Sequence, residues 1–312
     1  MNQFGIMVGF NKPAAFEGWF SKIDDQENDL MLSVIWGYST HATSKHAFLQ
    51  FTHSLEHKTL YIRYPLEQMQ WQEHPFVLKI GNNLLSEQEM QLDFEMDGVR
   101  VQGNFSFGNL TPIKTSFLKP NIMGWLTYFP NECNHSIISM YHTVNGKFSL
   151  GERSWDIQHA DGYMEKDWGT SFPNEYVWLH ANGWKSSGVV FSYATVPVLG
   201  RFAKGFFLVL HHEGDEYRFS SIEGARMLQF DVTKDSFRAR IGKGALRVEL
   251  FAKQKNPVAL ASPNRGEMRD YIKESLDGRV EISMTKGSSE LIRLVSDRAS
   301  IDVHFNLEES KS

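Results

Sequence analysis

Alternation of apolar and polar residues, interrupted at short intervals by turn residues, constrains the fold of this chain more than any other feature. In the segment 99–107, Val99, Val101 and Phe105 alternate with polar residues, so one face of a strand is buried and the other is wet. Asp97-Gly98 precedes this strand and is a strong two-residue hairpin signal. The same pattern recurs along almost the whole chain and predicts an all-β protein.

Neighbouring strands are expected to pair as hairpins, because short polar turns separate them. Asn145-Gly146 is a second hairpin signal, between strands expected at 137–144 and 147–150. The best candidate for a helix is the segment 263–276. The other expected strands are 16–23, 30–38, 47–55, 59–64, 76–80, 90–96, 155–157, 162–168, 177–182, 189–195, 205–211, 217–222, 228–232, 237–241, 246–252, 279–284 and 300–305.

The chain of 312 residues is long for a single core and long enough for two packed halves. The stretch 111–134 breaks the alternation and contains three prolines, the last of which is Pro130. We therefore expect an N-terminal domain of residues 1–130 and a C-terminal domain of residues 131–312. Many short strands are typical of barrels and sandwiches, so each domain is expected to be an antiparallel β-barrel or sandwich with little helix.

The composition argues against several classes of protein. Hydrophobic residues make up 41% of the chain and aromatic residues 13%, enough to bury a core without a metal or disulfide. The single cysteine, Cys133, cannot form an internal disulfide. The formal net charge is −5 and no block of Lys or Arg is present, so no nucleic-acid partner is expected. Without a signal-peptide pattern or a long apolar run, we expect a soluble, cytoplasmic protein with no transmembrane segment.

The segment 161–184, DGYMEKDWGTSFPNEYVWLHANGW, carries the most chemical information. In a strand, Tyr163, Glu165 and Asp167 project to one side, because successive side chains alternate between faces. Carboxylates about 7 Å apart on one face repel each other, so we expect a raised pKa for one of them, which would make it a proton donor. The alternative is a solvent-facing stripe, or an ion pair with Lys or Arg of a neighbouring strand.

A second polar and aromatic group lies at 16–20, FEGWF, where Glu17 and Trp19 share one face of an expected strand. Gly18 between them would weaken the strand unless something approaches its backbone closely. The alternative is a β-bulge or a barrel corner.

A third group lies at 177–182, where Trp178 alternates with His180 and Asn182. One aromatic ring and two hydrogen-bonding groups on one face suit a mostly apolar pocket with a few polar anchors. The alternative is an ordinary aromatic core.

Several common chemistries lack their sequence signals. His211 and His212 are adjacent on an expected strand and face opposite ways, and no Cys pair accompanies the other histidines. The chain has no G-x-S-x-G elbow, no G-x-G-x-x-G after a strand and no P-loop pattern. We therefore expect no metal site and no cofactor.

The segments FEGWF (16–20) and GYMEKDWGTSFP (162–173) together resemble the tocopherol cyclase family. The resemblance extends through 176–182, where family members carry an aromatic-rich W-x-W-x-Q-x-N type strand, and it covers Gly124-Trp125. It spans most of the chain in order, with a weakly similar stretch between the two main motifs. It implies a pair of tandem lipocalin-like β-barrel domains.

The resemblance also implies a chemistry. Plant and cyanobacterial members close a chromanol ring on a prenylated hydroquinone, and carotenoid hydratases of the same two-barrel architecture also act on isoprenoid double bonds. An acid protonates a trisubstituted alkene, and a phenol oxygen or water captures the resulting tertiary carbocation. Such a site needs a carboxylic acid kept protonated by desolvation and aromatic faces that stabilise a cation.

On this resemblance, Glu165 or Asp167 would be the proton donor, and Glu17 would be a second acid/base or an orienting partner. The remaining candidates would bind the substrate: Trp19, Trp168 and Trp178 would line the pocket, and Tyr163, His180 and Asn182 would hydrogen-bond its polar head.

Two functions of different classes remain open. The first is acid-catalysed cyclisation, hydration or isomerisation of an apolar, isoprenoid-type small molecule. The second is non-catalytic binding of a hydrophobic ligand, because a barrel of roughly eight strands holds one small ligand without any chemistry. The chain has Leu179-His180 where cyclases favour an aromatic and a glutamine, and Asp167 where plant enzymes have asparagine. These departures leave the substrate open, and the sequence does not indicate the oligomeric state.

Overall fold

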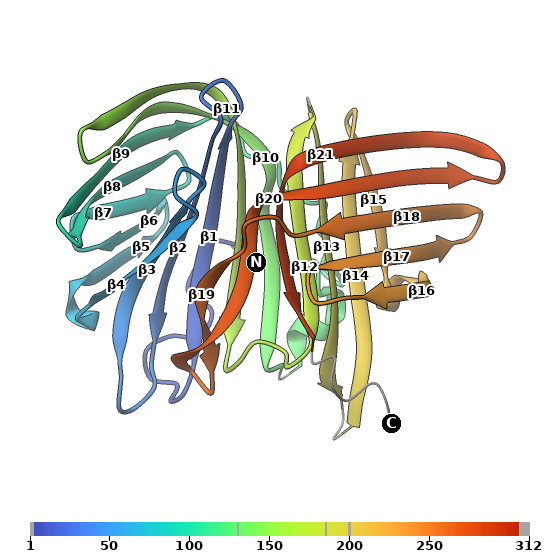
Figure 1. Ribbon diagram of the computed structural model, residues 1–312. Coiled ribbons are helices and arrows are strands. Elements are labelled where there is room, and N and C mark those ends of the chain that lie inside the picture. The colour runs from blue at the N-terminus through green and yellow to red at the C-terminus, as the bar shows by residue number, and fades with distance from the viewer. Residues whose placement is uncertain (1–2, 130, 185, 199–200, 306–312) are drawn as a thin grey trace. The chain divides into compact units, whose positions relative to one another are not determined.

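The computed structural model describes residues 3–129, 131–184, 186–198 and 201–305, and consists almost entirely of antiparallel strands (Figure 1). Two large sheets contain the strands, and one of these sheets nearly closes into a barrel. Helical structure in the described residues is limited to three 3₁₀ turns, η1 (Leu66–Gln68), η2 (Gly124–Tyr128) and η3 (Ser221–Glu223). The predicted all-β class with tandem lipocalin-like domains is confirmed. Within the described residues, no helix has the length and apolar character needed to span a bilayer.

The chain divides into two compact units. Unit 1 comprises the described residues of Met1–Phe129, Cys133–Phe172 and Ala261–Asp270. Unit 2 comprises those of Pro130–Glu132, Pro173–Leu260 and Tyr271–Ser312.

The sheet of unit 1 has eleven strands in the order β4-β3-β2-β1-β11-β10-β9-β8-β7-β6-β5. This order makes β11 the hydrogen-bonded neighbour of both β1 and β10, so segments far apart in sequence meet at the centre of the sheet. The bounds are β1 Phe16–Asp25, β2 Leu30–Ser39, β3 His46–His53, β4 Lys58–Tyr64, β5 Met69–Glu73, β6 Phe76–Ile80, β7 Asn83–Ser86, β8 Glu89–Met96, β9 Val99–Phe107, β10 Cys133–Leu150 and β11 Arg153–Gly169.

Large apolar side chains of alternate strand positions fill the core of unit 1. Trp36, Phe51, Phe76 and Phe148 are fully buried there and belong to one continuous cluster. In β9 the predicted alternation is present, because Val101, Gly103 and Phe105 are buried and the intervening residues are exposed. The three strands β1, β2 and β3 are instead buried on both faces, and β1 and β3 bury polar and charged side chains as well as apolar ones.

The sheet of unit 2 follows the order β15-β14-β13-β12-β21-β20-β18-β17-β16, and β19 pairs with β20 beside this path. Its core contains Phe191, Phe219, Phe237, Ile282 and Ile301. The bounds are β12 Tyr176–Trp184, β13 Ser187–Val198, β14 Arg201–His212, β15 Asp215–Ser220, β16 Arg226–Val232, β17 Ser236–Lys243, β18 Leu246–Lys253, β19 Val258–Asn264, β20 Glu267–Lys286 and β21 Ser289–His304.

The hairpin predicted at Asp97-Gly98 joins β8 to β9, as expected. Both residues have positive φ, 54° and 75°, as a two-residue turn of the twisted hairpin type requires. The second predicted hairpin is wrong. At Asn145-Gly146 the strand β10 continues, and the pairing with β11 is irregular between Val144 and Gly146. The signal therefore marks a β-bulge.

The helix predicted at 263–276 is also wrong. This segment contains the end of β19, a turn at Arg265-Gly266 with φ of 50° and 76°, and the start of β20. From Tyr271 to Glu274 exposed and buried residues alternate, which is the period of a strand.

The predicted domain junction, Pro130, lies outside the described residues. The residues on either side of it, up to Phe129 and from Cys133 to Phe172, contribute to the same unit. Unit 1 extends past position 130 because β10 hydrogen-bonds to β9 and to β11, and β11 hydrogen-bonds to β1.

Candidate active site

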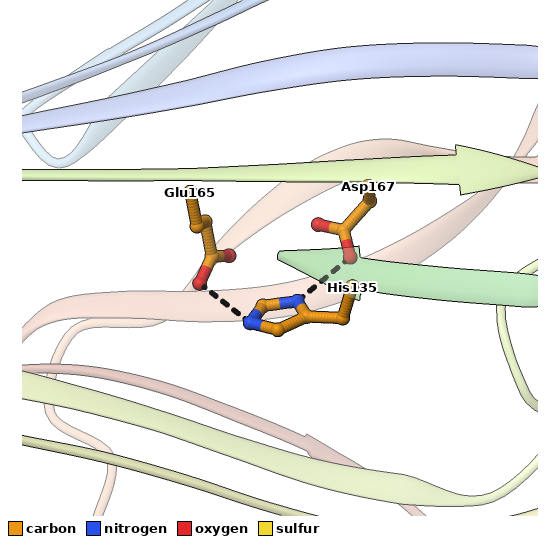
Figure 2. A group of neighbouring side chains, drawn as sticks. All are labelled: His135, Glu165 and Asp167. Atoms are coloured by element: carbon orange, nitrogen blue, oxygen red, sulfur yellow. Dashed lines mark hydrogen bonds and ion pairs between the residues drawn. The ribbon is translucent and has the colours of Figure 1, made fainter. Parts of the chain in front are cut away.

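One face of β11 carries the predicted group of a phenol and two carboxylates. A histidine of the neighbouring strand β10 lies beside the two carboxylates (Figure 2). In the pairing of β10 with β11, His135 is opposite Asp167 and Ile137 is opposite Glu165. Side chains at paired positions of an antiparallel sheet share a face. His135 therefore lies on the same face as Glu165 and Asp167.

The imidazole of His135 lies between the two carboxylates and contacts each with a different nitrogen (Figure 2). The distance from Nδ1 to Asp167 Oδ1 is 2.8 Å, and the distance from Nε2 to Glu165 Oε2 is 3.3 Å. The Tyr163 hydroxyl donates a hydrogen bond of 2.5 Å to the same oxygen of Glu165. Four side chains thus form a continuous polar chain, Tyr163–Glu165–His135–Asp167, which we call the site chain.

The site chain is largely shielded from solvent. Tyr163, Glu165 and His135 are buried and Asp167 is partly buried. Burial alone would lower the pKa of His135, but the charges of Glu165 and Asp167 outweigh it and raise this pKa to about 9. Burial and the adjacent Glu165 raise the pKa of Tyr163 well above its usual value. At neutral pH the site chain therefore holds an imidazolium between two acidic groups, with a protonated phenol at one end.

Among the described residues, one group of three side chains could offer ligand atoms to a metal ion, and its donor atoms all lie within 4.8 Å of one another. The group consists of His135, Glu165 and Asp167. An ion would require one imidazole nitrogen and both carboxylates to converge on a single point. Here the two carboxylates are bound to opposite nitrogens of the ring. Nδ1 is hydrogen-bonded to Asp167, and Nε2 lies within ion-pair distance of Glu165.

The opposite face of β11 carries a second buried group around Lys166. The ammonium of Lys166 lies 2.5 Å from Glu17 Oε1, and both side chains are fully buried. It also lies over the rings of Trp19 and Trp168, at 4.8 Å and 5.4 Å from their centroids. Glu17 further accepts hydrogen bonds from the Tyr38 hydroxyl and from the backbone N–H groups of residues 7 and 8.

The structure therefore separates the predicted site residues of unit 1 into two sets. Tyr163, Glu165 and Asp167 lie together on one face of β11. Glu17, Trp19 and Trp168 lie on the other face, because Glu17 pairs with Trp168 and Trp19 pairs with Lys166 in the register of β1 and β11. Gly18 pairs in regular register, so no bulge occurs there.

The third predicted set belongs to unit 2. Trp178, His180 and Asn182 are buried, and they alternate along β12 with residues of the unit 2 core, Leu179 and Ala181. The rings of Trp178 and His180 are 6.4 Å apart. The role of these three residues in binding a substrate stays a prediction.

Sequence reasoning missed His135. It lies 30 positions before Glu165 in the chain, between the proline-containing stretch 111–134 and the strand expected at 137–144. Strand pairing alone brings it to the carboxylates.

Comparisons with known proteins agree with this fold. The crystal structure of CghA matches with a TM-score of 0.58 at 8% identity, covering 94% of this chain and 89% of that one. The crystal structure of kievitone hydratase from Nectria haematococca matches with a TM-score of 0.51 at 9% identity, covering 94% and 89%. At 8% and 9% identity, both matches show a similarity of fold alone. A search of curated protein sequences gave no significant match.

The family comparison is more specific than the structural one. The model of the family described as "Tocopherol cyclase-like" matches residues 98–305, about two thirds of the chain. The matched region includes β10, β11 and β12, and with them the whole site chain. The chain belongs to the tocopherol cyclase-like family.

Proposed function

We propose that this protein is an enzyme that protonates a carbon–carbon double bond of an apolar, isoprenoid-type small molecule, followed by cyclisation or hydration. The observation that carries the proposal is the buried site chain, in which His135 holds a proton at neutral pH between Glu165 and Asp167. Membership in the tocopherol cyclase-like family supports it. A protein of similar fold is named a hydratase, which agrees with this reaction class.

Glu165 is the residue we assign as the proton donor. His135 Nε2 and Glu165 Oε2 form an ion pair at 3.3 Å, and transfer of the imidazolium proton to the carboxylate would give the neutral acid. Asp167 contacts Nδ1 at 2.8 Å and holds the imidazole with Nε2 directed at Glu165. Tyr163 donates to Glu165 and orients its carboxyl group.

The reaction adds this proton to one alkene carbon and leaves a tertiary carbocation on the other. In cyclisation a phenol oxygen forms the new C–O bond and releases its proton, whereas in hydration water forms the bond and releases a proton. The released proton returns to the site chain, so neither reaction needs an oxidant or a reductant.

The other predicted residues have supporting roles in this proposal. Glu17 serves as an orienting partner, because its ion pair with Lys166 joins β1 to β11, the strand that carries Glu165. Trp178, His180 and Asn182 belong to unit 2 and keep their predicted roles in substrate binding, the indole as pocket lining and the two polar groups as partners of the polar head. Trp19 and Trp168 flank Lys166 on the Glu17 face and support that ion pair.

Turnover in deuterium oxide tests the proposal. The protein is incubated with a prenylated hydroquinone or with an acyclic isoprenoid alkene, and the product is analysed by mass spectrometry. Protonation by the site chain predicts one deuterium bound to carbon in the product, and hydration additionally predicts a mass gain of one water. Glu165→Gln should fold normally and lose this incorporation.

A non-catalytic binding protein would give a different result. It would retain the apolar molecule through native mass spectrometry, and the molecule would carry no carbon-bound deuterium in either the wild type or Glu165→Gln. That outcome would reject the enzymatic proposal and favour hydrophobic ligand binding.

A further inference from the structure

One exposed segment of unit 1 concentrates large apolar side chains at the surface. Within Phe117–Phe129, which we call the aromatic segment, Phe117 is 85% exposed, Leu118 67% and Trp125 47%. Tyr128 and Phe129 are also exposed. Single exposed apolar residues are normal on a protein surface, but five within thirteen positions indicate a surface that meets an apolar partner.

The aromatic segment is held in a defined conformation by contacts among its own exposed residues. The Tyr128 hydroxyl donates a hydrogen bond of 2.8 Å to the carbonyl of Phe117, and their rings lie 6.3 Å apart. The rings of Trp125 and Phe129 pack edge to face at 5.6 Å. The exposed aromatic surface is therefore preformed, which lowers the entropic cost of binding.

Buried residues anchor the segment to unit 1, where the Gln3 side-chain amide donates a hydrogen bond of 2.7 Å to the Pro120 carbonyl. Pro120, Asn121 and Ile122 are buried between the two exposed groups of aromatic residues. The Asn121 side chain accepts hydrogen bonds from the Thr127 hydroxyl at 2.6 Å and from the Met123 N–H at 2.8 Å. The segment thus has a fixed base and an exposed apolar rim.

The charge of this region differs from that of the rest of the chain. Residues 108–131 contain Lys114 and Lys119 and no Asp or Glu, which gives a formal charge of +2. Because the whole chain has a formal charge of −5, the remaining residues sum to −7. Lys114 and Lys119 are both exposed.

We propose that the aromatic segment docks this protein on an anionic lipid surface. Trp and Tyr rings suit the boundary between headgroups and acyl chains, because each has an apolar body and a polar edge. Phe117 and Leu118 would enter the acyl region, and the two lysines would contact anionic headgroups. Docking would give the protein access to an isoprenoid-type substrate dissolved in the bilayer, and this part of the inference rests on the proposed function. The docking itself requires no catalysis.

Vesicle flotation of the full chain tests the inference. Binding is measured with vesicles of phosphatidylcholine alone and of phosphatidylcholine mixed with phosphatidylglycerol. We expect tighter binding to the mixed vesicles. The variant Phe117→Ala/Leu118→Ala/Trp125→Ala should bind them about 100-fold more weakly, and Lys114→Ser/Lys119→Ser should lose about tenfold of the affinity for mixed vesicles only.

Two controls connect the binding to this segment. Leu228→Ala/Tyr271→Ala removes exposed apolar side chains of unit 2 and should leave binding unchanged. Trp125→Phe should still bind but lose the blue shift of tryptophan emission that accompanies insertion. The triple variant is accepted only with an unchanged far-UV circular dichroism spectrum and melting temperature, and Trp125→Phe provides the readout if the triple variant misfolds.

Three results would overturn the inference. The first is that the wild type binds neither kind of vesicle. The second is that the wild type and the folded triple variant bind equally. The third is that the wild type forms a dimer in solution, the triple variant does not, and neither protein binds vesicles. A wild-type protein that binds the mixed vesicles but does not turn over an isoprenoid-type substrate would reject the proposed chemistry. It would leave the inference of lipid docking intact.

Discussion

Replacement of Lys166 by methionine tests how β11 is held in unit 1. The Lys166 ammonium and the Glu17 carboxylate are 2.5 Å apart and fully buried. Burial lowers the pKa of Lys166, and the charge of Glu17 opposes that shift. Lys166→Met removes the ammonium and leaves the Glu17 carboxylate buried with neutral donors, which are the Tyr38 hydroxyl and the N–H groups of Met7 and Val8.

The size of the effect follows from this environment. Removing one partner of a buried ion pair costs about 3–5 kcal/mol, because the other charge stays buried without compensation. Since three neutral donors continue to hydrogen-bond the Glu17 carboxylate, we expect the lower end, about 3 kcal/mol. The double variant Lys166→Met/Glu17→Gln removes both charges and should recover at least about half of that loss.

Urea unfolding followed by tryptophan fluorescence measures this cost, since Trp19 and Trp168 flank Lys166. Lys147→Met is the matched control, because the ion pair of Lys147 with Asp156 is 3.5 Å long and its side chains are 82% and 71% exposed. The control should lose little stability. If Lys166→Met is no more destabilising than Lys147→Met, the buried ion pair does not hold β11 as described.

The remaining predictions concern the proposed site. Because the folded-state pKa of His135, about 9, exceeds its ordinary value of 6.5, the stabilisation it gives is complete below pH 6.5 and is lost as the pH rises through 9. The difference corresponds to about 3 kcal/mol in urea unfolding, and it should be absent from His135→Gln. Glu165→Gln should unfold at a urea concentration near that of the wild type, while its turnover falls by at least about 100-fold. A variant that turns over substrate at the wild-type rate would exclude Glu165 as the proton donor. Trp178→Ala should weaken binding of an apolar probe that quenches tryptophan fluorescence, and unchanged affinity would place Trp178 outside the binding site.

The parts of the fold that local pattern determines could be predicted from the sequence. Alternation in 99–107 and the Asp97-Gly98 turn led to the correct hairpin, and alternation in GYMEKDW placed Tyr163, Glu165 and Asp167 on one face. Asn145-Gly146 led to a wrong hairpin prediction because the same residue types occur in β-bulges and in hairpin turns. Only the pairing of β10 with both β9 and β11 distinguishes a bulge from a turn at this position.

The site histidine could not be predicted because it depends on strand register. Leu150 pairs with Arg153 at the hairpin turn, and this register, continued without irregularity, would place His135 opposite Trp168. The register shifts along β10 place it opposite Asp167 instead. A slip of one residue moves a side chain to the other face of a sheet, so three irregularities in one strand decide whether the imidazole reaches the carboxylates.

The separation of Glu17 from Glu165 has a similar origin. The resemblance assigned both to one site, with Glu17 as a second acid/base or an orienting partner of the donor. Pairing of Phe20 with Glu165 and of Glu17 with Trp168 puts the two acids on opposite faces of the sheet. The charge partner that Glu17 finds there, Lys166, is a residue that the sequence analysis assigned no role.

The protonation state of His135 is the most direct test of the proposed chemistry. The titration of its ring, followed by NMR in histidine-labelled protein and assigned with His135→Gln, should show an imidazolium at neutral pH and an apparent pKa of about 9. Glu165→Gln should lower that value. A ring that is neutral at pH 7, with a pKa at or below 6.5, would contradict a proton held between Glu165 and Asp167.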